Sequence, residues 1–336
     1  MWTVLSRSRN GHNGIRCRHP NGRPRFVATR IVKGCGMTHE GWTRRDVLRR
    51  TALTTAVVLG GAAALSACES TGGADGKDAL QAAKDAKVIR IGIANEAPYG
   101  FADSSGKTTG EAPEVARAVF KVLGIDGVQA GVVPFDQLIP ALAAKQFDVV
   151  AAGMNITAKR CQAADFSAPD YSALTALLVP KGNPQGVRKL DDVAAKNVKV
   201  AVLSAAVEKG YLTGAGVAED QIQTLDTQDN MLRAVADGRV YAAALTDISL
   251  KWLVKQNPGV AVEVTPGFVP MEGGHPVVSA GGFVFRKEDD TLRVAFDAEL
   301  KKLHDSGDWV KIASPFGFDE SNLPKPDVTT EKLCTA

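Results

Sequence analysis

The chain has few of the side chains from which most enzyme and metal sites are built. Only 5 of its 336 residues are histidine, and only His275 and His304 lie beyond residue 68. The sequence separation between these two histidines, and between each of them and any cysteine, does not match the spacing of metal-ligand motifs. The sequence also lacks a G-x-S-x-G nucleophile motif, a phosphate-binding glycine loop and a paired-carboxylate motif. We therefore expect no metal, no cofactor and no enzymatic activity.

Acidic residues are scarce at the N terminus. Residues 1–67 hold 12 of the 40 Lys and Arg residues but 2 of the 37 acids, which leaves 28 basic and 35 acidic residues and a net charge of −7 beyond them. An acidic body disfavours a nucleic-acid partner, because phosphates require a basic surface. Residues 1–36 lack globular patterning, so we interpret them as a gene-model extension upstream of a start at Met37. A disordered basic arm is the alternative.

No apolar run is long enough for a membrane span. The longest candidate, residues 51–67, has 17 residues with three threonines, whereas a span needs about 20 apolar residues. It follows the pair Arg44-Arg45, which resembles a twin-arginine export motif, and it ends in LSAC, which resembles a lipobox. We interpret residues 37–67 as a lipoprotein signal peptide and Cys68 as the lipidated residue. Residues 68–86 would then tether an exported domain to the outer face of the cytoplasmic membrane.

Cysteine is also rare in the body of the chain. Of the five cysteines, only Cys161 and Cys334 lie beyond Cys68. An even pair in an oxidising compartment makes a disulfide plausible. Its loop of about 170 residues would give ~4–5 kcal/mol in the chain-entropy model. Two unrelated free thiols are the alternative.

Strand and helix patterns alternate from residue 87 onward. We expect strands at 88–94, 127–133, 147–152, 198–203, 221–225, 240–245, 260–264 and 281–287, with an extended apolar run at 171–180. We expect helices at 111–124, 135–146, 190–196, 207–213, 229–238, 249–256 and 291–312, the last with a break near Gly307. Such alternation predicts an α/β protein with mostly parallel sheets flanked by helices.

The pattern falls into two sets of elements and predicts two lobes. Lobe 1 would comprise residues 87–180 and 278–320, and lobe 2 residues 181–277. The C-terminal tail would comprise residues 321–336. Two crossings between lobes form a two-strand hinge, which predicts a ligand cleft between the lobes.

Several motifs within residues 87–320 resemble the extracytoplasmic solute-binding proteins of polar amino acid ABC importers, family 3. They are NEAPYGFADSSGKTTGEAPEVARAV, FDQLIPALAAKQFDVVAAGMNITAKR, GRVYAAALTD and GFVFRKED. The first two are similar in particular to the subgroup that binds ectoine and hydroxyectoine. The resemblance implies a two-lobed type II periplasmic-binding-protein-like fold. It also implies partners: a small zwitterionic ligand, and ABC permease subunits with their ATPase.

The resemblance also implies a set of ligand-binding residues. Arg160 would fork onto the ligand carboxylate, as bidentate guanidinium geometry allows, and Asp247 would hold the ligand ammonium. Other positions implied by the resemblance or by the strand ends are Glu96, Tyr99, Phe135, Gly153, Asn155 and Thr157. Aromatic rings at Tyr99 and Phe135 would enclose a delocalised cation whose ring nitrogens pair with Glu96. The family's expected aromatic near residue 155 is Asn155 here, and its Gly-Thr after a second-lobe strand is Ala205-Ala206.

Five of these residues have an alternative structural interpretation. Thr157 and Asp247 fit helix N-caps, Tyr99 and Phe135 fit core packing, and Arg160 fits an exposed first helical turn. We expect a monomeric solute receptor without enzymatic activity. A general polar amino acid-binding protein is one alternative. A dehydratase-like enzyme on the same fold, with Glu96 or Asp247 as its acid or base, is another.

Overall fold

The computed structural model of the protein describes residues 78–335. The predicted extension, signal peptide, lipidation site at Cys68 and first part of the tether lie outside these residues. Within residues 78–335, no helix combines the length and the apolar character that crossing a membrane requires.

The first sheet has the strand order β4-β1-β5-β15-β6, and β7 also pairs with β15. The strands are β1 (Val88–Ile93), β4 (Gly127–Val132), β5 (Val149–Asn155), β6 (Asp165–Phe166), β7 (Tyr171–Ala173) and β15 (Ser279–Phe285). β1 runs parallel to β4 and β5, whereas β15 is antiparallel to its neighbours. We call this sheet and its helices the first lobe.

The second sheet has the order β10-β9-β11-β8-β12. Its strands are β8 (Thr175–Pro180), β9 (Val200–Leu203), β10 (Ile222–Leu225), β11 (Ala242–Thr246) and β12 (Val262–Val264). β9 is parallel to both neighbours, and β8 is antiparallel to β11 and β12. We call this sheet and its helices the second lobe.

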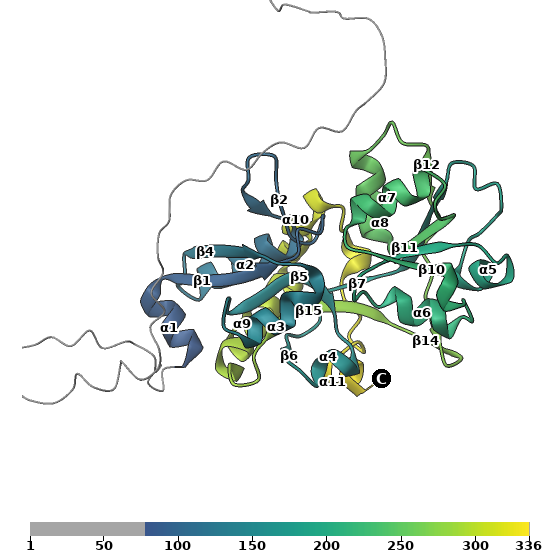
Figure 1. Ribbon diagram of the computed structural model, residues 1–336. Helices are drawn as coiled ribbons and strands as arrows, with labels where there is room; N and C mark the ends of the chain where they lie inside the picture. Colours follow the sequence, from purple (N-terminus) through teal and green to yellow (C-terminus); the bar gives the residue numbers. More distant parts are fainter. Residues whose placement is uncertain (1–77, 336) are drawn as a thin grey trace, which may run out of the picture. The chain divides into compact units, whose positions relative to one another are not determined.

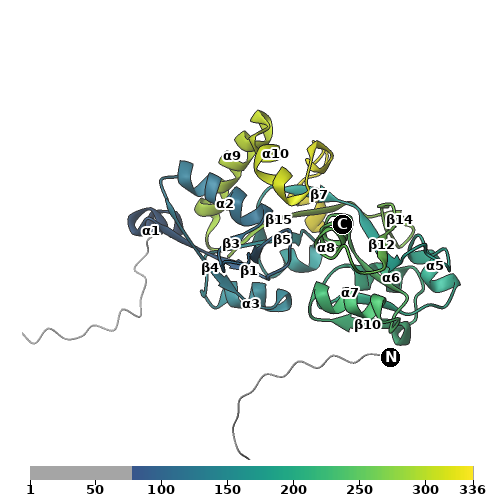
Figure 2. The same cartoon turned by 90° about the horizontal axis from the view of Figure 1, so that it is seen from above.

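Helices cover both faces of each sheet (Figures 1 and 2). On the first lobe, α1, α2, α9 and α10 share one apolar core with Ile91, while α3 and α11 share another with Val150. On the second lobe, α7 and α8 pack on one face, and α5 and α6 on the other. The α-helices are α1 (Ala79–Ala86), α2 (Glu111–Val122), α3 (Leu138–Ala143), α4 (Ala158–Cys161), α5 (Leu190–Ala195), α6 (Glu208–Gly214), α7 (Gln228–Ala236), α8 (Asp247–Gln256), α9 (Asp290–Ser306), α10 (Asp308–Ala313) and α11 (Thr330–Thr335).

Short elements complete the fold. Two small hairpins pair β2 with β3 and β13 with β14. They comprise β2 (Phe101–Ala102), β3 (Thr108–Thr109), β13 (Met271–Glu272) and β14 (His275–Pro276). The 3-10 turns are η2 (Phe135–Gln137), η3 (Glu219–Gln221), η4 (Ser314–Phe316) and η5 (Glu320–Asn322). The expected helix at 135–146 is thus a 3-10 turn followed by the short α3.

The chain crosses between lobes earlier than the sequence indicated. We expected lobe 1 to extend to residue 180, but β8 belongs to the second sheet, so the crossing lies at Leu174. The run 171–180 is mostly apolar on both sides of Leu174, and the sequence therefore did not indicate this break. In the structure, Leu174 is 41% exposed. The strand before it, β7, pairs with β15 of the first sheet, and the strand after it, β8, pairs with β11 of the second sheet. The chain returns between β12 and β15, and a bridge between Thr175 and Phe268 joins the two crossings.

The predicted fold class, a two-lobed α/β architecture with two crossings, is confirmed. The sheets are mixed rather than mostly parallel, because the strands next to the crossings, β8 and β15, are antiparallel to their neighbours. These strands arrive from the opposite lobe and so lack the crossover helix that makes a parallel βαβ unit.

Candidate functional site

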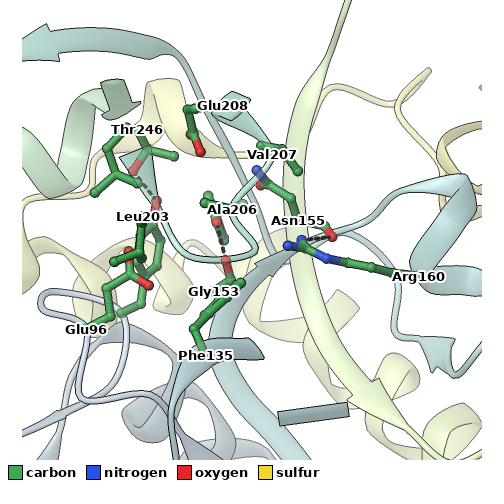
Figure 3. Close-up of a pocket in the computed structure, with 13 residues that line it drawn as sticks. Glu96, Phe135, Gly153, Asn155, Arg160, Leu203, Ala206, Val207, Glu208 and Thr246 are labelled. Carbon is green, nitrogen blue, oxygen red and sulfur yellow. Dashed lines mark hydrogen bonds between the residues drawn. The ribbon is translucent and has the colours of Figure 1, made fainter. Parts of the chain in front are cut away.

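A small cavity of about 30 Å³ has walls from both lobes (Figure 3). It lies beyond the carboxyl ends of β1, β5, β9 and β11, the place where ligands bind in open α/β sheets. The lining residues from the first lobe are Glu96, Tyr99, Phe135, Gly153, Asn155, Arg160 and Tyr171. Those from the second lobe are Leu203, Ala206, Val207, Glu208, Leu245 and Thr246.

Arg160 reaches the cavity from α4, a single turn that starts after β5. Its backbone N–H is capped by the Thr157 hydroxyl at 3.3 Å. Its Nη1 donates to the Asn155 carbonyl at 2.8 Å, and its Nη2 donates to the Ala205 carbonyl of the second lobe at 2.9 Å. The guanidinium lies 5.3 Å from the centre of the Phe135 ring. A guanidinium has five N–H donors, so those beyond these two bonds could bind an anionic group.

Glu96 follows β1 and is 9% exposed. Its Oε1 accepts a hydrogen bond of 3.0 Å from Gln228, the first residue of α7 on the second lobe. Burial raises the pKa of Glu96 to about 7, while the Gln228 hydrogen bond and the charge of Arg160 act in the opposite direction. The carboxyl is thus held near the point where it changes charge at neutral pH.

Glu208 brings a second carboxyl to the cavity from the start of α6. It is 2% exposed, and its Oε2 has no hydrogen-bond partner among residues 78–335. Burial raises the pKa of Glu208 to about 7, and the charge of Glu96 adds to this shift. Sequence reasoning missed this residue, because an acid in the first turn of a helix is ordinarily explained by the helix dipole.

Two tyrosines form an apolar wall beside these charges. The Tyr99 and Tyr171 ring centres are 5.0 Å apart. The Tyr99 hydroxyl donates to Thr246 Oγ1 at 3.0 Å, and the Tyr171 hydroxyl donates to the Gly153 carbonyl at 2.7 Å. Gly153 has φ +59°, and a Cβ there would lie 2.2 Å from the Tyr99 ring. A glycine is therefore required for this ring to take its place. Tyr171, which lies next to the crossing, was not predicted as a site residue.

Two expected ligand contacts do not line the cavity. Thr157 serves as the cap of α4. Asp247 is the first residue of α8, where its Oδ1 accepts from the Leu174 N–H at 3.2 Å and its Oδ2 pairs with Lys251. The carboxylate is thus engaged at the crossing between lobes, and the preceding residue, Thr246, lines the cavity instead. The sequence placed the helix start two residues later, which left Asp247 free to face a ligand.

Asn155 occupies the position where an aromatic ring was expected. Its side-chain Oδ1 accepts a hydrogen bond of 3.3 Å from the Ser279 hydroxyl, and its carbonyl holds Arg160. The aromatic surface near Arg160 is therefore provided by Phe135, Tyr99 and Tyr171 alone among the lining residues.

A disulfide joins Cys161 to Cys334, with their Cα atoms 5.6 Å apart. Cys161 is the last residue of α4 and directly follows Arg160, and Cys334 lies in α11. The covalent link therefore fastens the C-terminal helix to the helical turn that carries the guanidinium.

Comparisons with known proteins place the chain in a family. The model of the bacterial extracellular solute-binding proteins, family 3, matches residues 89–319. The chain is 35% identical over 259 residues to the probable amino-acid ABC transporter periplasmic-binding protein y4tE of Sinorhizobium fredii. This match covers 76% of this chain and 86% of y4tE.

Solved structures agree with this assignment. The crystal structure of EhuB in complex with hydroxyectoine is 35% identical, with a TM-score of 0.68, and covers 77% of this chain and 99% of EhuB. An ancestral arginine-binding protein bound to arginine is 29% identical, with a TM-score of 0.61, and covers 69% of this chain and 99% of its own. On these matches, the chain belongs to the bacterial extracellular solute-binding proteins of family 3.

Proposed function

We propose that the protein captures a small zwitterion, with ectoine or hydroxyectoine as its ligand, and delivers it to the permease of an ABC importer. The observation that carries this proposal is the cavity between the lobes, which both the guanidinium of Arg160 and the buried carboxyl of Glu96 line. A zwitterion has one charge for each of these groups. The hydroxyectoine bound by the EhuB relative supports this ligand class.

The arrangement gives each part of such a ligand a partner. A carboxylate can accept hydrogen bonds from the free N–H groups of Arg160. The delocalised cation of a cyclic amidine can lie against Tyr99 and Phe135, where each cation–π contact contributes ~0.5–2 kcal/mol. Glu96 is then placed to accept hydrogen bonds from the ring nitrogens.

Hydrogen bonds between the lobes support a mechanism of closure around the ligand. Tyr99, Glu96 and Arg160 on the first lobe bond to Thr246, Gln228 and Ala205 on the second. Because all three first-lobe residues line the cavity, we propose that closing the lobes completes the site and encloses the ligand. The resulting closed form would be the one that docks on the permease and its ATPase.

The rest of the proposal concerns location and assembly. We propose that the chain is exported through its twin-arginine signal, that Cys68 is lipidated and that the protein acts as a monomer at the outer face of the membrane. The predicted tether of residues 68–86 is shorter than expected, because residues 79–86 form α1, which packs on the first lobe. We propose that residues 68–78 tether the two lobes to the membrane surface. No enzymatic step is needed in this role.

A second candidate is a general polar amino acid-binding protein. It is favoured by the arginine bound in the 29% identical structure and by the amino-acid transport role in the name of y4tE. The ammonium of such a ligand would need a carboxylate, and Glu96 could supply it.

Calorimetric titration of the purified protein with ectoine, hydroxyectoine, L-arginine, L-glutamine and glycine betaine tests the proposal. We expect the two ectoines to bind most tightly. Tight binding of arginine or glutamine with no binding of the ectoines would favour the second candidate. The absence of binding to all five would contradict both. A turnover assay with a cyclohexadienyl acid addresses the dehydratase alternative.

A further inference from the structure

The cavity contains more negative charge than a simple zwitterion requires. Two carboxyls, Glu96 and Glu208, line it, whereas Arg160 is the only Lys or Arg among its lining residues. The two acids come from different lobes. In Figure 3 the Glu208 carboxyl is directed toward the space enclosed by the lining residues.

Within the part of the chain that the structure describes, one oxygen of the buried Glu208 carboxyl lacks a hydrogen-bond donor. The side chain is 2% exposed, and its Oε2 is unbonded among the described residues. The Arg160 Nη atoms already donate to the carbonyls of Asn155 and Ala205. A buried carboxyl without a partner is unfavourable, so it must hold a proton or accept a hydrogen bond from a cation.

The cation near Glu208 is Arg160, whose two Nη atoms already donate to backbone carbonyls. Glu96 raises its pKa by charge repulsion, and Arg160 opposes this with its positive charge. The remaining titratable group that interacts with it is the hydroxyl of Tyr211, whose own pKa is raised by burial and by the charge of Glu208. A neutral hydroxyl and a repelling acid leave the position open to a donor from a ligand.

We propose that Glu208 binds the cationic group of the ligand from the second lobe while Glu96 binds it from the first. The inference rests on the proposed function, because it assumes that a zwitterion fills the cavity. It names the chemical class of that zwitterion: one whose cation bears N–H donors that can reach two acceptors, such as a cyclic amidinium, a guanidinium or an ammonium. A quaternary ammonium has no N–H and could donate a hydrogen bond to neither carboxylate.

Calorimetry on the wild-type protein and the Glu208→Gln variant tests this inference, with ectoine, L-arginine and glycine betaine as probes. Gln keeps the shape of the side chain and removes the charge. One or more of the N–H-bearing probes should bind the wild type. For such a probe, we expect the affinity of the variant to be at least tenfold lower than that of the wild type. We also expect the wild type to bind glycine betaine more weakly than that probe. Glu219→Gln, an exposed acid on the same lobe that pairs with Lys209, is the matched control and should bind like the wild type.

Thermal unfolding without ligand separates binding from folding. We expect Glu208→Gln to leave the melting temperature unchanged or raised, because it removes a buried unpaired carboxyl. Unchanged affinity for the N–H-bearing probes would overturn the inference, and so would a lowered melting temperature with equal weakening of every probe. If the wild-type protein binds none of the probes, the proposed function fails first; if it binds them and the variant binds equally well, this inference fails alone.

Discussion

Arg160 of the first lobe donates a hydrogen bond of 2.9 Å to the backbone carbonyl of Ala205 on the second lobe. Ala205 presents this carbonyl from a left-handed conformation with φ +57°. The guanidinium is also held by the Asn155 carbonyl of its own lobe. Closure of the lobes therefore fixes the orientation of the one Lys or Arg side chain that lines the cavity. We therefore propose that binding of an anion and closure of the lobes are coupled through this side chain.

Replacing Arg160 with Ala should weaken binding of a zwitterion by ~2–5 kcal/mol, the range for truncating one partner of a buried charge pair. The loss should appear in calorimetry as weaker affinity. Arg188→Ala, an exposed arginine of the second lobe, is the control and should bind like the wild type. An affinity within twofold of the wild type for Arg160→Ala would remove the guanidinium from the site.

Replacing Gln228 with Ala should weaken ligand binding by roughly 1–3 kcal/mol, because Glu96 loses its buried hydrogen-bond donor. The Gln228 hydrogen bond lowers the pKa of Glu96, so that pKa should rise further in the variant. Titration calorimetry at two pH values measures both effects. Gln256→Ala, at an exposed position at the end of α8, provides the comparison. If both variants bind equally well, the contact between lobes has no role in binding.

The stability of the ligand-free protein should fall as pH rises. Glu96 and Glu208 have folded pKa values of about 7, raised from 4.5. The folded state therefore holds more protons than the unfolded state between these values, and stability is lost as pH rises through the folded pKa. Each carboxyl contributes roughly 3 kcal/mol over this interval at most. The charge of Glu96 contributes to the shift at Glu208, so the sum is smaller than twice that figure.

Urea unfolding between pH 5 and pH 8.5 measures this dependence. The buried acids Glu111 and Asp170, whose pKa values are also raised by burial, contribute with the same sign. To isolate the contribution of the cavity, the wild type is therefore compared with Glu208→Gln. The free energy of unfolding of this variant should fall less steeply as pH rises. Parallel curves for the two proteins would argue against a raised pKa at Glu208.

Breaking the disulfide should destabilise the protein by ~2–5 kcal/mol, the usual range for a native disulfide. The bond links residues that are 173 apart in sequence and fastens α11 to α4. Cys334→Ser, measured by thermal unfolding, should melt at a lower temperature than the wild type. Because Cys161 is adjacent to Arg160, we also expect weaker ligand binding. An unchanged melting temperature in non-reducing buffer would show that the tail is held by packing alone.

The sequence predicted the parts of the site that depend on local pattern. The strand that ends at Asn155, the turn that follows it and the basic residue at Arg160 are contiguous in the chain. The structure brings Glu96, Tyr99, Phe135, Gly153, Asn155 and Arg160 to one cavity. The alternation of elements also predicted the two α/β lobes, because buried strands and amphipathic helices differ in their apolar period.

Other features depend on contacts between distant segments. Glu208 and Gln228 lie near Glu96 only because the two lobes are in contact. Tyr171 is placed within the first lobe by the pairing of β7 with β15, which comes much later in the chain. No local pattern distinguishes these residues from other helix-start polar residues or buried rings. The same reason explains Asp247, whose carboxylate is engaged by Leu174, 73 residues away in sequence. The crossing at Leu174 likewise lies within the mostly apolar run 171–180. It is recognised only because the two halves of this run belong to different sheets.

The sequence by itself determined the alternating elements, the family motifs and the cation at Arg160, because these depend on residue order within short segments. Only the tertiary structure decided which acids face that cation. The placement of Glu96 and Glu208 in one cavity follows from how the two sheets lie against each other. Burial at that contact then sets the pKa of both carboxyls.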